Sequence, residues 1–136
     1  MNEKIKSFIA RNQLLALSVI ENDEVYSASC YYAFDEECIN LIFKSQRESK
    51  HIQLALKCPK VGVIIAQDAK KIGLLQGVQI KALFKMASVS QEKLYYQKFP
   101  FAKLGEGEVF ALEILWAKYT DNKLLLTKKL TFKKGE

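Results

Sequence analysis

The stretch from residue 14 to residue 44 constrains the fold most, because three β-forming segments alternate there with two short polar turns. The segments are Leu14–Ile20, Val25–Phe34 and Cys38–Lys44. Each is rich in β-branched, aromatic or other large apolar residues, and only residues 21–24 and 35–37 separate them. Turns this short join antiparallel neighbours, since parallel strands need a much longer crossover. The sequence therefore predicts an antiparallel meander of three strands.

The second half of the chain continues the β pattern. The predicted strands are Val61–Gln67, Ile72–Ala87, Glu108–Tyr119 and Leu124–Phe132. Gly77 interrupts the long second segment and predicts a bulge or a bend there. In the third segment, alternate apolar residues from Phe110 to Trp116 would share one face. The predicted fold class is therefore mainly β: a small, closed or partly closed, Greek-key-like antiparallel barrel of about six to seven strands.

Three short helices are expected beside the strands. They cover residues 3–12, residues 46–57, and a segment that begins after Ser90 and ends near Phe99–Pro100. The first would place Ile5, Phe8 and Ile9 on one apolar face. Pro59 would end the second, because proline cannot continue a helix.

Composition limits the classes of protein to consider. No linker, repeat or low-complexity segment divides the 136 residues, so a single domain, 1–136, is expected. No apolar run approaches the roughly 18 residues that a membrane span needs, and no signal-peptide pattern opens the chain, so we expect a cytoplasmic protein. The formal net charge is +6, but only two of the 21 basic residues are arginines. Without a nucleic-acid motif, this charge does not favour a nucleic-acid partner.

The chain offers few residues for metal or nucleophilic chemistry. Its three cysteines form no CxxC pair and it has one histidine, which disfavours a zinc site. Cys30 and Cys38 lie in apolar, strand-like surroundings and are expected to be small core residues. No catalytic triad or pair of carboxylates is visible.

The segment Phe43–Pro59 is where polar groups concentrate. It is predicted to be a strand end, a short turn and an amphipathic helix. Ser45 and Glu48 have the spacing of a capping box, which would start the helix at that turn. A helix N-terminus favours anions, phosphate above all, because its first amides are unpaired and its dipole is positive.

Hydroxyl and basic side chains surround this predicted helix start. They are Lys44, Ser45, Arg47, Ser49, Lys50 and His51. Two interpretations stay open on the local pattern alone. The segment is either a phosphate-binding site or an ordinary surface helix with solvated charges.

The order of these elements resembles the FMN-binding split barrel of the pyridoxamine 5'-phosphate oxidase superfamily. Within it, the chain is most similar to the YhbP-like bacterial proteins, whose function is poorly defined. The motifs that carry the resemblance are Gly77–Lys81, Lys98–Lys103 and Lys118–Asn122, the last of which precedes the basic pair Lys128–Lys129. The resemblance spans nearly the whole chain.

The resemblance implies FMN as cofactor and a set of binding residues. Lys44, Ser45, Ser49, Lys50 and His51 would hold the phosphate, with His51 standing where many relatives have a second cation. The flavin ring would lie along the second strand, at Ser29 and Cys30. Either Gln76 or Gln79 would meet the ring, and the choice between them is open.

The resemblance further implies a homodimer with FMN at the interface between the subunits. The expected function is that of a flavoprotein, an oxidoreductase of unknown substrate that uses a small-molecule redox substrate or a nicotinamide donor. Trp116 and the segment 98–103 of a partner chain would close over the ring. The alternative is a non-catalytic flavin- or haem-binding protein on the same barrel, with His51 as the haem ligand.

Overall fold

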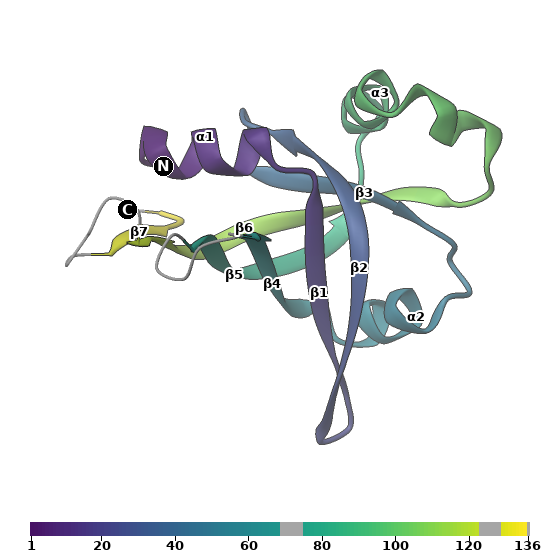
Figure 1. Ribbon diagram of the computed structural model, residues 1–136. Coiled ribbons are helices and arrows are strands. Elements are labelled where there is room, and N and C mark those ends of the chain that lie inside the picture. Colours follow the sequence, from purple (N-terminus) through teal and green to yellow (C-terminus); the bar gives the residue numbers. More distant parts are fainter. Residues whose placement is uncertain (69–74, 123–128, 136) are drawn as a thin grey trace.

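Six strands close into a barrel at the centre of the molecule (Figure 1). The computed structural model describes residues 1–68, 75–122 and 129–135. The barrel strands are β1 (Leu14–Glu21), β2 (Glu24–Asp35), β3 (Asn40–Ser45), β4 (Lys60–Gln67), β5 (Gln76–Met86) and β6 (Glu108–Asp121). The other described elements are β7 (Leu130–Lys133), α1 (Glu3–Arg11), α2 (Lys50–Lys57), α3 (Val89–Lys98) and the 3-10 helix η1 (Pro100–Leu104).

The strands follow the order β3–β2–β1–β4–β5–β6–β7, and pairing of β3 with β6 closes the sheet on itself. Every pair of neighbouring strands is antiparallel. β7 lies outside the ring, against β6. The mainly β fold and the antiparallel barrel that the sequence predicts are therefore confirmed.

A short ladder joins β1 to β4 in the barrel wall. These strands pair over residues 16–18 of β1 and 62–64 of β4. Beyond Ser18, β1 continues with β2 alone as far as the pair Glu21 and Glu24. The end of this hairpin projects from the barrel wall (Figure 1). Asn22 in its turn has a φ of 55°, a left-handed conformation that asparagine tolerates better than most residues.

The barrel interior is apolar and is closed at one end by α1. Ile5, Phe8 and Ile9 of that helix are fully buried, which confirms the amphipathic face predicted for residues 3–12. The hydroxyl of Tyr32, a fully buried residue of β2, donates a hydrogen bond of 2.7 Å to the carbonyl of Ile9. This bond fastens the end of α1 to the barrel, since a buried hydroxyl needs a partner.

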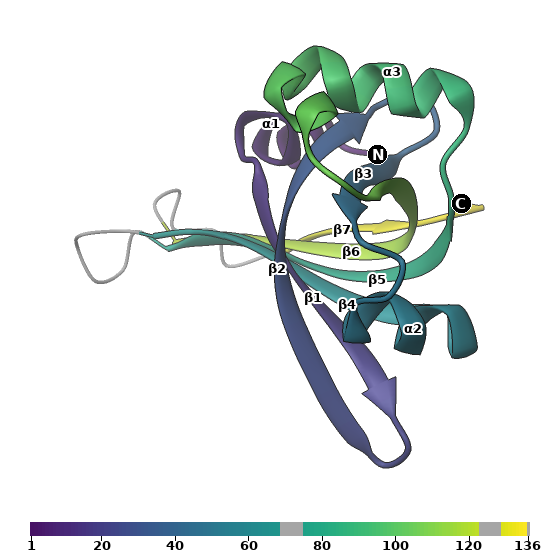
Figure 2. The same cartoon turned by 90° about the vertical axis from the view of Figure 1, so that its right-hand side faces the viewer.

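The helices cover some faces of the barrel and leave another bare. Tyr95 of α3 packs on Ala33 and Ile42, on the outer side of β2 and β3. α2 lies at the opposite end of the barrel from α3, beside the β1–β2 hairpin (Figure 2). Large apolar side chains of β1, β2 and β4 remain exposed on the outer face of these strands. None of the described helices combines the length and the apolar character that crossing a bilayer requires.

Two details of the predicted strands are wrong. Gly77 pairs regularly with Ala66 and Thr120, and the bulge lies instead between Lys81 and Ala82, across from β6. The extra residue of β6 shifts the alternation of its side chains, so that buried Ala117 follows Ile114 on the inner face. Trp116 therefore does not share the face of the preceding alternate residues.

Other predicted boundaries fall outside the described residues. These are the beginning of the strand predicted from Ile72 and all of the predicted last strand before residue 129. Cys30 is buried as expected, but Cys38 is exposed. Cys38 lies in the turn between β2 and β3, where the next residue, Ile39, has a φ of 57°.

Candidate functional site

The end of β3 and the start of α2 bring three of the predicted phosphate-binding side chains together. The Oγ atom of Ser45 lies 2.7 Å from Nε2 of His51 and 3.4 Å from Oγ of Ser49. Ser45 occupies the last position of β3, whereas Ser49 immediately precedes α2. The short turn between the strand and the helix therefore positions a cluster of hydroxyl and imidazole groups beside a helix N-terminus.

No side chain caps the first turn of α2. Ser49 is the N-cap residue, but its hydroxyl donates a hydrogen bond of 2.6 Å to the carbonyl of Gln46. This hydroxyl makes no capping hydrogen bond to an amide of the helix. Uncapped amides at the positive end of a helix dipole favour an anion.

The capping box predicted for Ser45 and Glu48 is wrong, as is a helix that begins at residue 46. The helix begins at Lys50. Ser45 is still part of β3, where it pairs with Glu108 of β6. Residues 46–49 form an irregular turn after the β3–β6 ladder, and Ser49 instead of Ser45 is the N-cap residue of the helix.

His51 is half-buried, and burial lowers its pKa from the usual value of 6.5. This shift favours the neutral imidazole at pH 7. The imidazole contributes a hydrogen bond to the cluster through Ser45, not a second positive charge.

Lys50 points to the β1–β2 hairpin. Its Nζ atom lies 2.9 Å from Oε2 of Glu21 and 4.9 Å from the centre of the Tyr26 ring. The hydrogen bond to Glu21 and the charge of Glu21 raise the pKa of Lys50. Glu21 is thus the ion-pair partner of the ammonium group that was predicted to bind phosphate.

The remaining basic residues of the cluster also have partners. Lys44 donates to the carbonyls of Ala102 and Gly105, which fastens the segment after α3 to β3. Arg47 makes two hydrogen bonds to the carboxylate of Glu108, at 2.7 and 2.9 Å. Intramolecular contacts therefore use both of these side chains in this structure.

Ser29 and Cys30 of β2 face opposite sides of the barrel wall. Ser29 is exposed on the outer face, whereas Cys30 points inward and is 8% exposed. Burial raises the pKa of the Cys30 thiol to about 11, so this sulfur is protonated at neutral pH. Only Ser29 of this pair presents its side chain to the outer surface.

The two candidate glutamines lie in different places. Gln79 is exposed on the outer face of β5, across from Ile64 of β4, and Ile64 in turn pairs with Ala16 of β1. Ala16 pairs with Ser29, so Ser29 and Gln79 belong to one row across the outer face. Gln76 instead contacts Arg11 and Asp121 at the end of the barrel beneath α1.

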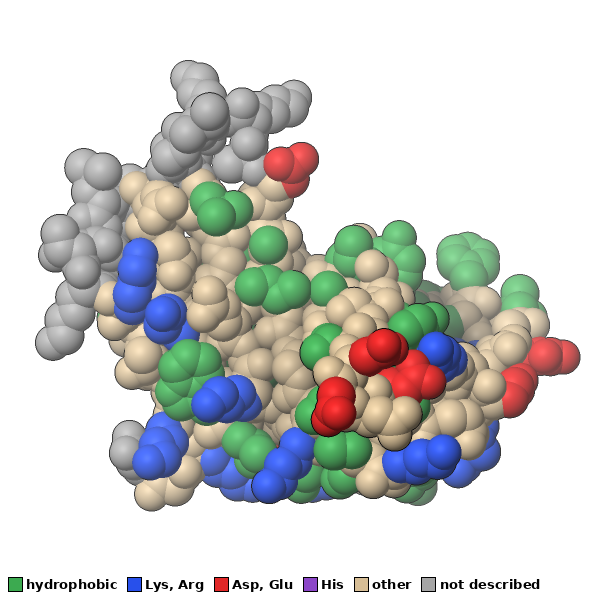
Figure 3. All heavy atoms as spheres, turned by 90° about the horizontal axis from the view of Figure 1, so that it is seen from below, with side chains coloured by type: hydrophobic (Ala, Val, Ile, Leu, Met, Phe, Trp, Pro, Cys, Tyr) green, Lys and Arg blue, Asp and Glu red, His purple; other side chains and the backbone are tan. Residues whose placement is uncertain are grey.

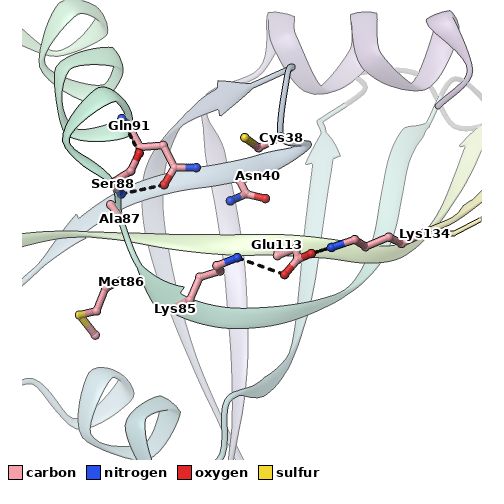
Figure 4. Close-up of a pocket in the computed structure, with 9 residues that line it drawn as sticks. All are labelled: Cys38, Asn40, Lys85, Met86, Ala87, Ser88, Gln91, Glu113 and Lys134. Atoms are coloured by element: carbon pink, nitrogen blue, oxygen red, sulfur yellow. Dashed lines mark hydrogen bonds and ion pairs between the residues drawn. The ribbon is translucent and has the colours of Figure 1, made fainter.

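A polar cleft of about 550 Å³ opens on another side of the barrel, and the sequence alone did not point to it (Figure 4). Glu113 of β6 is 8% exposed and forms ion pairs with Lys85 and Lys134. Buried Asn40 of β3 and Gln91 of α3 also line the cleft. The signal in the sequence is Glu113 itself, a carboxylate in the middle of the apolar run of residues 109–117.

The closed barrel with its strand–turn–helix junction defines the class of fold. Solved structures that share it include a haem-binding protein from Mycobacterium smegmatis, with a TM-score of 0.81, 8% identity and coverage of 96% of this chain. This chain spans 57% of that protein. The class is the split barrel of proteins similar to pyridoxamine 5'-phosphate oxidase, as the resemblance in sequence implied.

Two further structures belong to the same class of fold. An FAD-binding protein from Mesorhizobium loti has a TM-score of 0.72 and 15% identity, over 85% of this chain and 88% of that one. A putative pyridoxamine 5'-phosphate oxidase from Listeria innocua has a TM-score of 0.68 and 16% identity, over 86% and 95% of the two chains.

Closer relatives identify the family. A UPF0306 protein of Campylobacter jejuni is 47% identical over 135 residues, which cover 98% of this chain and 99% of the relative. A UPF0306 protein of Haemophilus ducreyi is 31% identical over 137 residues, covering 93% and 94%. The chain therefore belongs to the UPF0306 family. No family model matches it.

Proposed function

We propose that this protein binds FMN, with the phosphate group of the cofactor at the junction of β3 and α2. The observation that carries the proposal is the uncapped first turn of α2, which Ser45, Ser49 and Lys50 surround. Backbone amides, hydroxyls and an ammonium group together suit a phosphate dianion, because charge-assisted hydrogen bonds are the strong ones. Solved structures with the same fold include one described as an FAD-binding protein and one described as a putative pyridoxamine 5'-phosphate oxidase, which supports a flavin.

The residues present fit a phosphate on one condition. Glu21 and Glu108 neutralise Lys50 and Arg47 in this structure. An incoming phosphate would therefore have to take Lys50 from Glu21. Both side chains of that pair are half-exposed, so the exchange costs little.

The flavin ring would extend from the phosphate along the outer face of β2. Ser29 and Gln79 share a row on that face, so their side chains would contact the ring or its edge. Cys30 faces inward and would offer only its backbone. The bound flavin would supply hydride or electron transfer, while the residues of this chain bind and orient it.

We further propose that the working form is a homodimer and an oxidoreductase that acts on a small-molecule substrate or a nicotinamide donor. Leu14, Tyr31 and Ile64 are 50%, 57% and 41% exposed on the outer face of the barrel. A second copy of the chain placed on this face would bury these side chains and shield the flavin ring from water. The mass of the protein in solution, measured by light scattering, tests the dimer.

The experiment that tests FMN binding compares FMN with riboflavin, which has the same ring and no phosphate. We expect the purified protein to retain FMN after desalting, with visible flavin absorbance bands, and to bind riboflavin more weakly. Lys50→Ala should weaken FMN binding at least tenfold, on the scale of losing about one charge-assisted hydrogen bond. Lys57→Ala, a change in the last turn of the same helix, is the matched control and should leave the affinity unchanged.

Equal affinity of the protein for FMN and riboflavin would contradict a phosphate site at α2. Unchanged FMN binding in Lys50→Ala would do the same. A protein that binds no flavin would favour the haem alternative, since the structural neighbour from Mycobacterium smegmatis is described as haem-binding. His51 is the single histidine of the chain, so His51→Ala should then abolish the haem absorbance.

A further inference from the structure

An apolar slot of about 420 Å³ lies where β1 and β4 separate, away from the junction of β3 and α2. Buried Val19, Val61 and Ala82 belong to its lining. More exposed apolar side chains, Ile20 and Val25, add to the wall from the β1–β2 hairpin. Pockets of this volume with a mainly apolar lining commonly hold small ligands.

The strand pairing explains why the slot exists. β1 and β4 stay paired only as far as Ser18 and Gly62, and the hairpin then diverges from the barrel wall. The bulge between Lys81 and Ala82 lies on the neighbouring strand, and Leu115 of β6 lies opposite it in the slot. The gap between the strands therefore exposes apolar side chains that a continuous sheet would cover.

Charge defines what the slot accepts. Its only charged lining residues within the described chain are Lys60 and Lys81, and both are exposed. Lys81 lies 5.5 Å from the centre of the Trp116 ring, and neither lysine forms an ion pair with a described carboxylate. Figure 3 shows basic and apolar side chains side by side along one side of the face seen from below. An apolar cavity with unpaired ammonium groups complements a molecule with an apolar body and one negative end.

We propose that this slot binds a single-chain aliphatic carboxylate, with the alkyl chain against Val19 and Val61 and the carboxylate between Lys60 and Lys81. This proposal does not rest on flavin binding. The polar cleft at Glu113 fits such a ligand less well, because its carboxylate already has two lysine partners. In the slot, by contrast, a ligand would neutralise charges that have no partner among the described carboxylates.

The test titrates sodium alkanoates of increasing length, below the concentrations at which they form micelles. Trp116 is the single tryptophan of the chain and lies beside Lys81, so its fluorescence reports binding directly. We expect the affinity to rise about fourfold for each added methylene group until the slot is filled. Decan-1-ol and decyltrimethylammonium, which have the same chain length without a negative end, should bind at least about tenfold more weakly than decanoate.

Two kinds of variant locate the site. Gly62→Leu adds an apolar side chain to the lining of the slot, and a Cβ at this position meets only the Cβ of Ser18, at 4.0 Å. It should abolish decanoate binding. The double variant Lys60→Gln and Lys81→Gln should reduce the affinity at least about tenfold while leaving the apolar lining intact. Lys118→Gln, on the same sheet but not in the slot, is the matched control and should bind like the wild type.

Several results would overturn the proposal. One is equal affinity for decanoate and decyltrimethylammonium. Another is wild-type affinity for decanoate in Gly62→Leu, when the melting temperature of this variant equals that of the wild type. A third is decanoate binding only when the mass in solution falls from dimer to monomer, because the slot would then belong to an interface with a second copy. Loss of flavin binding alone would leave these results unchanged, so the two proposals fail separately.

Discussion

Replacing Glu21 by Gln should strengthen FMN binding, because Glu21 competes with the phosphate for Lys50. The Glu21 carboxylate lies 2.9 Å from Lys50 Nζ, and the two side chains are 36% and 50% exposed. Exposed ion pairs contribute little, and their loss corresponds to a change of about two- to fivefold in an equilibrium constant. Glu21→Gln keeps the shape of the side chain and removes the charge. The dissociation constant of FMN should therefore fall about two- to fivefold.

The assay is a fluorescence titration of FMN, with riboflavin titrated in parallel. Riboflavin has no phosphate, so its affinity should not change in Glu21→Gln. Added salt should reduce the gain for FMN, since it screens exposed charges. Glu24→Gln is the matched control, because Glu24 lies in the same hairpin and is not the hydrogen-bond partner of Lys50. It should have a smaller effect.

A double-mutant cycle separates the contact from the general loss of negative charge. In the Lys50→Ala background, Glu21→Gln should increase the FMN affinity much less than it does in the wild type, since the effects of mutating two residues that share one interaction are not additive. Two results would refute the idea that Glu21 competes for this ammonium group. One is an equal increase in riboflavin affinity in Glu21→Gln, and the other is an equal increase in FMN affinity in the Lys50→Ala background.

Three further predictions follow from other contacts. Burial lowers the pKa of His51 below 6.5, so the unfolded chain takes up this proton first as the pH falls. As the pH is lowered from about 6.5, the free energy of unfolding should therefore decrease, and it should decrease less in His51→Gln than in the wild type. Urea denaturation measures this free energy, and equal decreases in the two proteins would contradict the prediction. Tyr32→Phe removes the bond to the Ile9 carbonyl and should cost about 1–2 kcal/mol in the same assay, whereas Tyr31→Phe, at an exposed site, should cost little. Exposed Cys38 should react with a thiol reagent at pH 8 in the folded protein and buried Cys30 should not, and equal rates of modification would contradict the burial of Cys30.

The fold was predictable because its determinants are local and repeated. The alternation of apolar residues and short polar turns in residues 14–44 predicts the meander that β1, β2 and β3 form. The spacing of Ile5, Phe8 and Ile9 likewise predicts the buried face of α1. Patterns of this kind lie within one element or between neighbours, where the period of the side chains decides which face is buried.

The start of α2 could not be predicted in this way. Ser45 and Glu48 satisfy the spacing of a capping box, but Ser45 is paired with Glu108, 63 residues further along the chain. The spacing of a capping box is therefore present in the sequence, but residues 46–49 form a turn and the helix begins only at Lys50. The position of the bulge in β6 also could not be read from local pattern, because it depends on the register with β5.

The charges of the candidate site show the same limit. From the sequence, Arg47 and Lys50 count as cations available to a phosphate. In the folded chain Arg47 forms an ion pair with Glu108 and Lys50 forms one with Glu21, and both carboxylates are far away in the sequence. The sequence thus predicts which groups gather at the helix start. Only the closed barrel determines which of these groups already have an intramolecular partner that a ligand must displace.

The β1–β2 hairpin connects the two proposed sites. Successive residues of a strand point to opposite faces, so Glu21 and Tyr26 turn toward α2, whereas Ile20 and Val25 turn outward to the slot. A shift of the hairpin register by one residue would exchange these faces and disrupt both sites together. The position of one hairpin therefore determines both the partner of Lys50 and the opening of the apolar slot.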